Sequence, residues 1–395
     1  MSGSTIAPRV VDATDRAWKG ILSGFCASLV GIGMARFAYT PLLPAIIEAH
    51  WFQPSAAVYL GAANLAGYLG GALAGRSVAA RLTATAALRM MMVLATLSFF
   101  ACADPLGFSW FFVWRFFSGF AGGVLMVLAA PTVLPHLPPS RRGLAGGIIF
   151  MGVGAGIAAS GTLVPLLLSQ GLRQSWIGLG AIAMMLTLVS WRGWPAEDAA
   201  PQVKHHKISE SLPLRALYAE YALNAAGLVP HMLFLVDFIA RGLGQGLHDG
   251  AEYWVLFGLG AVAGPIINGH VADRLGFARV LRISYLIEAG AVLLPALGGG
   301  PACLMLSSVV IGAFTPGIVP LVLGRVNELL AHHPAGQKSA WSKATVSFAV
   351  VQAVSAYGFS YILAWTDDYR QLFVIGAIAM MLAFIIDLTV GRRKA

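Results

Sequence analysis

The chain has 395 residues, of which 58% are hydrophobic and only 11% are charged, and its mean hydropathy is +0.76. A water-soluble domain carries about 25% charged residues, so this composition excludes an ordinary soluble fold and favours one embedded in a lipid bilayer. In a soluble protein the net charge of +9 would suggest a nucleic-acid partner. Here the basic residues lie in short segments between apolar runs, so membrane topology accounts for them, and we expect no nucleic acid among the partners.

Twelve apolar runs are long enough to cross a bilayer, which takes about 20 residues. The first six lie at residues 18–47, 54–75, 83–103, 108–135, 143–168 and 174–194. After a polar stretch, six more lie at residues 213–240, 250–272, 280–298, 302–330, 341–365 and 371–390. The sequence therefore predicts an all-α membrane protein with two six-helix bundles, residues 1–194 and 213–395, joined by a cytoplasmic linker at residues 195–212.

The basic residues predict the orientation of these spans, because Lys and Arg are enriched in cytoplasmic loops. With both termini in the cytoplasm, only Arg173, Arg241 and Arg370 fall in outer loops, and Arg36 and Arg115 fall inside spans. The remaining 21 of the 26 Lys and Arg residues lie on the cytoplasmic side. We therefore predict twelve spans with both termini inside. The basic inner loops and the Ala- and Gly-rich composition favour the cytoplasmic (inner) membrane of a bacterium.

The two halves share a trace of internal repetition. Residues 71–76, after the second span, read GALAGR, and residues 269–274, after the eighth span, read GHVADR, 198 positions later. The Gly-containing run at residues 122–134 has a counterpart at residues 317–329, about 195 positions later. Two similar offsets indicate one duplicated six-helix unit, which is common among secondary transporters.

The segment after the eighth span, GHVADRLGFAR at residues 269–279, resembles a loop signature of the major facilitator superfamily. Its usual basic residue is displaced by one position, and the first-half copy has Gly75 where the family carries an aspartate. The resemblance implies a gate on the cytoplasmic side that is asymmetric between the two halves. The residues that it implicates are Gly269, Asp273, Arg274 and Gly276.

Two further strings resemble the same superfamily. Arg115-x-x-x-Gly119, followed by Gly122 and Gly123, is similar to the arginine motif of the fourth span, where such arginines are associated with proton coupling. An open alternative is that Arg115 lies near the outer surface, where it reaches water or helps to close the outer gate. The string GIGMARFAYTPLLP at residues 31–44 resembles the YbfB/YjiJ-type branch. The superfamily resemblance covers essentially the whole chain and implies the major facilitator fold with alternating access.

Arg36 is the candidate anchor for a substrate. A charge inside a membrane costs at least ~2.5–3.5 kcal/mol on insertion scales, so it usually faces a cavity or a partner. A planar guanidinium suits a carboxylate, and we therefore expect Arg36, with Tyr39 beside it in the same string, to bind an anionic organic solute. The alternative is a structural arginine that snorkels or pairs with a carboxylate of another helix.

The seventh span carries a polar stripe. Glu220, Asn224 and His231 are separated by four and seven residues, which places them on one helical face with Gly227. Pro230 interrupts the backbone hydrogen bonding nearby. We expect this face to line the cavity, with Glu220 taking up protons and Asn224 and His231 contacting substrate or protons. The alternative places Glu220 at the inner interface and makes His231 a helix–helix contact.

Asn64 and Tyr68, one turn apart on the second span, are also candidates for substrate binding. The alternative is that they hold helices together, for about 0.6 kcal/mol per polar group. We expect Asp237 and Glu288 to act as structural or interfacial groups rather than as coupling sites.

Other functional classes lack their motifs. No GxxxxGK[ST], HExxH or GxSxG string occurs, and no CxxC pair joins the cysteines, so we expect neither an enzyme nor a cofactor or metal. An ion gradient is then the energy source, and we expect protons because no sodium site is readable. The predicted function is secondary active transport of a small anionic solute by a monomer. The alternative is a membrane receptor or scaffold that does not transport.

Overall fold

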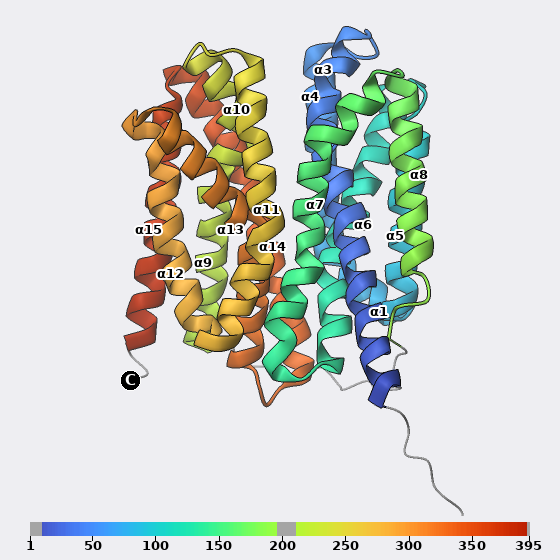
Figure 1. Cartoon of the computed structure of the whole chain (residues 1–395), viewed down its shortest axis with the longest axis vertical. Coiled ribbons are helices and arrows are strands. Elements are labelled where there is room, and N and C mark those ends of the chain that lie inside the picture. Colours follow the sequence, from blue (N-terminus) through green and yellow to red (C-terminus); the bar gives the residue numbers. More distant parts are fainter. Residues whose placement is uncertain (1–9, 196–210, 393–395) are drawn as a thin grey trace, which may run out of the picture.

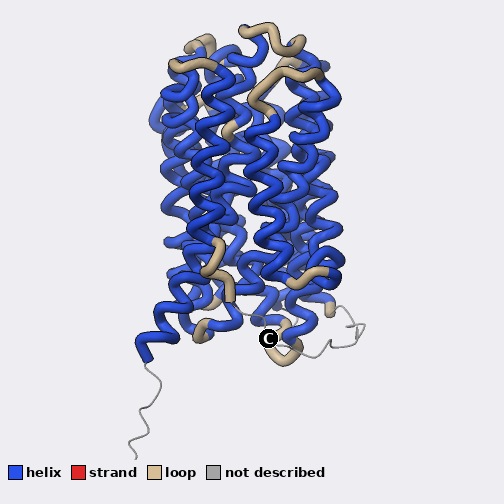
Figure 2. The backbone as a smooth tube through the Cα atoms, turned by 90° about the vertical axis from the view of Figure 1, so that its right-hand side faces the viewer, coloured by secondary structure: helices blue, strands red, loops and turns tan. Residues whose placement is uncertain are grey.

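A computed structural model of the protein describes residues 10–195 and 211–392, and helices account for nearly all of them (Figures 1 and 2). The predicted linker at residues 195–212 lies largely outside the described residues, as do the basic residues closest to both termini. The long helices follow the predicted apolar runs.

The first half contains α1 (Val10–Ser28), a π-helical segment η1 (Leu29–Met34), α2 (Ala35–Phe37), α3 (Tyr39–Glu48), α4 (Pro54–Arg81), α5 (Ala84–Ala101), α6 (Phe108–Val133), α7 (Arg142–Leu168) and α8 (Leu172–Ser190). The second half contains α9 (Leu212–Val229), π-helical η4 (Pro230–Phe234), α10 (Leu235–Asp237), π-helical η5 (Phe238–Gly242), α11 (Leu247–Leu275), α12 (Phe277–Leu293), α13 (Gly300–Leu329), α14 (Pro334–Thr366) and α15 (Tyr369–Arg392).

Within the described residues, 11 helical stretches are long and apolar enough to cross a membrane. The second predicted span, which corresponds to α4, is not among them. With 28 residues and a rise of about 1.5 Å per residue, α4 is about 42 Å long, more than the roughly 30 Å of hydrocarbon in a bilayer. The all-α class is confirmed, whereas the count of twelve spans stays a prediction.

Several helices extend beyond their predicted spans. α4 continues to Arg81 and α14 begins at Pro334, so Arg76, Arg81 and Lys338 are helical residues and not loop residues as predicted. Hydropathy detects only the part of a helix that is apolar enough for the bilayer. The polar turns that continue the same hydrogen-bonded helix into the headgroup region give no apolar signal.

The helices form two groups (Figure 1). In the first group, α4 and α5 pack on α6, and α1 packs on α7; in the second, α13 packs on α11, and both α14 and α15 pack on α9. The groups meet mainly through α7 against α11 and α4 against α14. We call the end at which α1 begins and α15 ends the base (Figure 1).

Glycines allow the central helices to touch backbone to backbone. A Cβ added at Gly119 of α6 would stand 1.9 Å from the carbonyl oxygen of Asn64 on α4, and one at Gly67 would stand 1.9 Å from the carbonyl oxygen of Phe116. Between the groups, a Cβ at Gly154 of α7 would stand 1.9 Å from the Ala261 carbonyl oxygen of α11. Small residues at such spacings are the usual means of close helix association in membranes.

Candidate functional site

The predicted substrate anchor follows a break in the first long helix. The backbone is π-helical from Leu29 to Met34, and Arg36 is the second residue of the short helix α2 that follows. The break lies against α7, because a Cβ on Gly33 would stand 2.8 Å from the Cα of Gly156. π-helical turns occur frequently at functional sites, because the extra residue redirects side chains. The absence of a side chain at Gly33 therefore allows this break to pack directly against the α7 backbone.

The Arg36 guanidinium has no carboxylate partner among the described residues. Its carbon lies 5.3 Å from the ring centroid of Phe37, and the side chain is only partly buried. The hydroxyl of Tyr68 on α4 is close enough to interact with it electrostatically. Tyr68 also interacts in this way with Tyr221 of α9 in the second group. Arg36 and Tyr68 therefore lie near the meeting surface of the two groups.

Tyr221 belongs to a buried aromatic cluster of the second group. The Tyr221 ring lies 6.4 Å from the Trp341 ring of α14 in a stacked arrangement and 4.6 Å from the Phe348 ring. The Trp341 indole nitrogen donates a 3.1 Å hydrogen bond to the carbonyl oxygen of Met126 on α6. A side chain of the second group is thus anchored to the first. Sequence reasoning missed Tyr221, Trp341 and Phe348, because apolar-run analysis treats aromatic residues as ordinary membrane residues.

Arg115 is buried at the centre of the first group and does not reach the outer surface. Its side chain is 3% exposed, donates a 2.8 Å hydrogen bond to the Ala35 carbonyl oxygen and stacks 4.3 Å above the Tyr39 ring. The Tyr39 hydroxyl donates to the Ala57 carbonyl oxygen at 2.7 Å. Arg115 and Tyr39 therefore form a contact that holds α2 and α3 against α6 and α4.

Asn64 bonds to the same part of α6. Its amide nitrogen donates to the Arg115 carbonyl oxygen at 3.3 Å and to the Ser118 hydroxyl at 3.4 Å. These contacts match the helix-joining alternative, and the predicted substrate role of Asn64 stays untested. Of the predicted substrate residues in the first half, the structure brings Arg36 and Tyr68 together and ties Tyr39 and Asn64 to Arg115.

The polar stripe of the seventh span faces into the second group. The Asn224 amide nitrogen donates a 2.8 Å hydrogen bond to Oε2 of Glu288 on α12 and a 3.3 Å one to the sulfur of Met380 on α15. Asn224 and Glu288 are both completely buried. Sequence reasoning placed Glu288 in a peripheral, structural role; the structure makes it the partner of a predicted site residue.

His231 lies at the helix break η4 and makes a helix–helix contact. Its Nε2 is 2.7 Å from the hydroxyl of Ser307 on α13, and that hydroxyl donates its single proton to the Ala291 carbonyl oxygen at 2.6 Å. Nε2 is therefore the donor to Ser307, and Nδ1 is a buried acceptor without a partner within residues 10–195 and 211–392. The proposed contact of His231 with substrate stays untested.

Glu220 is 3% exposed and has no hydrogen-bond or ion-pair partner within the described part of the chain. Its electrostatic neighbours are Asp387 of α15, Arg325 of α13 and Arg282 of α12. Arg282 and Asp387 form an ion pair with a 2.5 Å Nε–Oδ2 separation. Glu220 therefore lies beside a charged pair near the base, and not at a free surface.

The predicted gate residues join the two groups at the base. Asp273, near the end of α11, accepts hydrogen bonds of 2.8 Å from the backbone nitrogens of Gly143 and Leu144 in the first turn of α7. A Cβ at Gly269 would stand 2.2 Å from the Gly143 carbonyl oxygen. Gly276 ends α11 with φ +85°, a conformation that favours glycine. Arg274 is exposed on the same turn.

The equivalent contact from the first half lacks the aspartate. α4 has Gly75 at the corresponding position, and the next residue, Arg76, donates a 2.8 Å hydrogen bond to the Ser339 hydroxyl of α14. One side of the base is therefore joined by a carboxylate at a helix N-terminus, and the other by an arginine and a serine. The contacts at the base are asymmetric.

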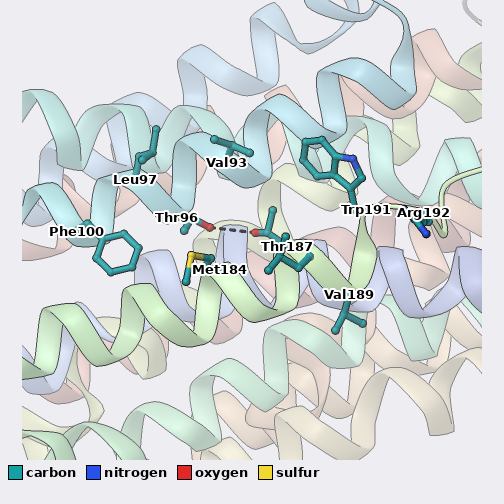
Figure 3. A pocket seen from close by; sticks show the side chains of 10 residues that line it. Val93, Thr96, Leu97, Phe100, Met184, Thr187, Val189, Trp191 and Arg192 are labelled. Atoms are coloured by element: carbon teal, nitrogen blue, oxygen red, sulfur yellow. Dashed lines mark hydrogen bonds between the residues drawn. The ribbon is translucent and has the colours of Figure 1, made fainter.

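Two hollows lie away from the predicted substrate residues. One, of about 700 Å³, lies between α5 and α8 at the edge of the first group, with Thr96 hydrogen-bonded to Thr187 and with Trp191 and Arg192 among its lining (Figures 1 and 3). The other, of about 320 Å³, lies at the base between α7, α13 and α14 and includes Asn327. Neither is lined by a predicted substrate residue.

Comparison with known proteins places the chain in a transporter family. Residues 28–388 match the family described as "Uncharacterised MFS-type transporter YbfB". FucP, the E. coli fucose:proton symporter in the outward conformation, is 16% identical over 96% of this chain and 98% of its own, with a TM-score of 0.73. The proton:xylose symporter XylE is 14% identical over 94% and 95% (TM-score 0.74), and the human organic anion transporter MFSD10 is 16% identical over 94% and 99% (TM-score 0.76).

These solved structures establish the major facilitator fold, and the family match extends over most of the chain and includes the string at residues 31–44. The resemblance identified from the sequence motifs is confirmed. The family also indicates a transporter rather than an enzyme, with a small-molecule substrate. The protein belongs to the YbfB-type family of major facilitator superfamily transporters and is a multi-pass membrane protein.

Proposed function

We propose that the protein moves a small anionic organic solute across the cytoplasmic membrane of a bacterium, coupled to protons, by alternating access between its two helix groups. In this proposal α4 also crosses the membrane, which brings the number of spans to twelve. Residues 1–194 and 213–395 are the two bundles, and the base faces the cytoplasm. The protein acts as a monomer and uses no cofactor.

The observation that carries the proposal is the position of Arg36. It lies near the surface where the groups meet, and no carboxylate among the described residues neutralises it. An unpaired charge in a membrane protein is costly unless a ligand or water compensates for it. A carboxylate on the substrate would supply that compensation through paired hydrogen bonds to the guanidinium. Among the similar structures, MFSD10 is described as an organic anion transporter, which supports the same class of solute.

The aromatic cluster around Tyr221 suits the rest of such a solute. Tyr221 of α9 packs against Phe348 and Trp341 of α14, and these buried rings supply apolar surface. An anion held at one end by Arg36 could place its carbon skeleton against these rings. The site would then combine one charge contact with apolar walls, a common composition for small-molecule sites.

Alternating access requires contacts that form in one state and break in the other. Asp273 with the first turn of α7, and Arg76 with Ser339, both cross between the groups at the base. We assign these contacts to the gate on the cytoplasmic side, and Gly269, Arg274 and Gly276 to its framework. Proton coupling is supported by buried acidic residues in the second group, and FucP and XylE are described as proton symporters.

Uptake into proteoliposomes tests the proposal. Labelled organic anions are offered with and without an imposed pH gradient, to the wild-type protein and to Arg36→Ala. We expect accumulation that depends on the gradient and falls at least tenfold in the variant. Transport of cations or neutral solutes by both proteins alike would contradict the anion assignment. No uptake of any solute would favour the receptor or scaffold alternative.

A further inference from the structure

Asn224 and Glu288 form a buried pair that is short of one hydrogen-bond donor. The Asn224 amide nitrogen donates to Oε2 of Glu288 at 2.8 Å. The other two oxygens of the pair, Oε1 of Glu288 and Oδ1 of Asn224, are buried and have no hydrogen-bond partner in the part of the chain that the structure describes. Both side chains are completely buried. Two acceptors in one pair of contacting side chains thus lack a donor.

A single proton would satisfy both oxygens. An ionised carboxylate can only accept hydrogen bonds, whereas a protonated one carries an O–H donor. A proton on Oε1 of Glu288 would make that oxygen a hydrogen-bond donor. Oδ1 of Asn224 is the acceptor that such a donor would satisfy. The acid and the amide would then be joined by two hydrogen bonds. Without the proton, the pair holds a buried charge that is compensated by one amide alone, which is strongly unfavourable.

No cation among the described residues takes the place of that proton. On α12 itself, Arg282 is paired with Asp387 of α15 at 2.5 Å. On η4, His231 uses its donor on Ser307. The ionisable groups around Tyr285, one turn from Glu288, are Glu220 and Tyr221 of α9, Glu288 itself and Asp387 of α15, and none of these four supplies a positive charge.

Polar groups lead from the pair toward the base. Tyr285 lies one turn before Glu288 on α12, and Glu220 lies one turn before Asn224 on α9, so both shift toward the base on neighbouring helices. The Tyr285 hydroxyl is completely buried and has no hydrogen-bond partner among the described residues, and it lies within electrostatic range of Glu220, Glu288 and Asp387. A hydroxyl both donates and accepts, so it can pass a proton between carboxylates.

We propose that the Glu288–Asn224 pair is a proton-binding site, filled from the base by way of Glu220 and Tyr285. This inference rests on the proposed proton-coupled transport for its use in the cycle. Proton binding converts Glu288 from carboxylate to carboxylic acid and completes its second bond to Asn224; release reverses both changes. Asn224 and Tyr221 both lie on α9, on the base side of the helix break at Pro230. The protonation state of Glu288 therefore favours one position of α9, and with it one position of Tyr221 relative to the substrate.

Infrared spectroscopy tests the site without any substrate. Purified protein in lipid vesicles is stepped from acidic to alkaline pH, and the carbonyl stretch of a buried protonated carboxyl is followed. We expect a band in the wild type that is absent in Glu288→Gln, shifted in Glu288→Asp and retained in Glu220→Gln. Gln reproduces the two bonds of the protonated acid, so its Tm should stay within about 2 °C of wild type, a small change for a chain of this size. An unchanged band in Glu288→Gln would overturn the proposal.

Transport then tests the use of the site. With an anion that the wild-type protein accumulates, Glu288→Gln should lose accumulation driven by the pH gradient and keep exchange across the membrane without a gradient, because a fixed neutral side chain still permits the conformational cycle. Accumulation at the wild-type level in this variant would overturn the coupling role. If the wild type itself ignores the gradient while the infrared band depends on Glu288, the proton site stands and the proposed coupling of transport is wrong.

Discussion

Asp273 of α11 accepts a 2.8 Å hydrogen bond from the backbone nitrogen of Gly143, so a carboxylate of the second helix group caps the first turn of α7 in the first group. The second carboxylate oxygen accepts from Leu144 at the same distance. A helix N-terminus has unpaired N–H groups and a partial positive charge, both of which favour an anion. This contact makes the base of the molecule a charge-dependent junction.

Replacement of Asp273 by asparagine should open the base. The variant loses the charge and one of the two acceptors, at a cost of ~1 kcal/mol for a helix cap, which is roughly a fivefold change in the ratio of closed to open molecules. In a background without the native cysteines, a cysteine at Asn327, which lines the hollow at the base, should react faster with a thiol reagent. Asp104→Asn, which breaks an exposed ion pair with Arg173, is the control. Equal labelling rates in both variants would argue against the gate.

An alanine at Gly119 should destabilise the first group strongly. The Cβ of that alanine would stand 1.9 Å from the Asn64 carbonyl oxygen on α4. Relief of this clash requires a shift of the α4 backbone. Overpacking of this kind costs about 1–3 kcal/mol or more. Thermal unfolding in detergent should show a clear loss of Tm. Gly290→Ala on α12 is the matched control, because a Cβ there meets nothing within 4 Å, and a similar Tm for the two variants would contradict the packing.

Substitution of His231 by glutamine should leave the pH dependence of transport unchanged. The ring donates to Ser307 from a completely buried position, and glutamine keeps a donor there. Glu288→Gln should change the pH dependence, because it removes the proposed proton site. Initial uptake rates across a range of pH compare the two variants with wild type. A displaced profile in His231→Gln would show that the histidine takes part in proton movement.

The sequence predicted the features that depend on local composition. Apolar runs marked the long helices, and the string at residues 269–279 marked residues that join α11 to α7, because both signals lie within contiguous residues. The break at Leu29–Met34 was not predicted. Gly33 lies in this break and packs against Gly156 of α7. That close packing can be inferred only once α7 is known to lie opposite the break.

Contacts between distant residues account for the rest. Glu288 gave the same sequence signal as any acidic residue in an apolar run, and its pairing with Asn224, 64 residues away, depends on how α12 packs against α9. For Arg115, a position near the outer surface was an open alternative, on the basis of its distance from the start of the helix. The structure turns its guanidinium inward, where Ala35 supplies an acceptor and Tyr39 a ring face. The periodicity of a single helix does not reveal which neighbour each face meets.

The role of Arg36 is tested most directly by ligand-induced thermal stabilisation of the purified protein. A ligand that binds only the folded state adds RT ln(1+[L]/Kd), about 2.7 kcal/mol at 100 times Kd. Organic anions should raise the Tm of the wild-type protein, leave Arg36→Ala unchanged and stabilise Arg36→Lys less, because an ammonium lacks the paired geometry of a guanidinium. Equal stabilisation of the wild type and Arg36→Ala by cationic or neutral compounds would contradict the account and make Arg36 a structural residue.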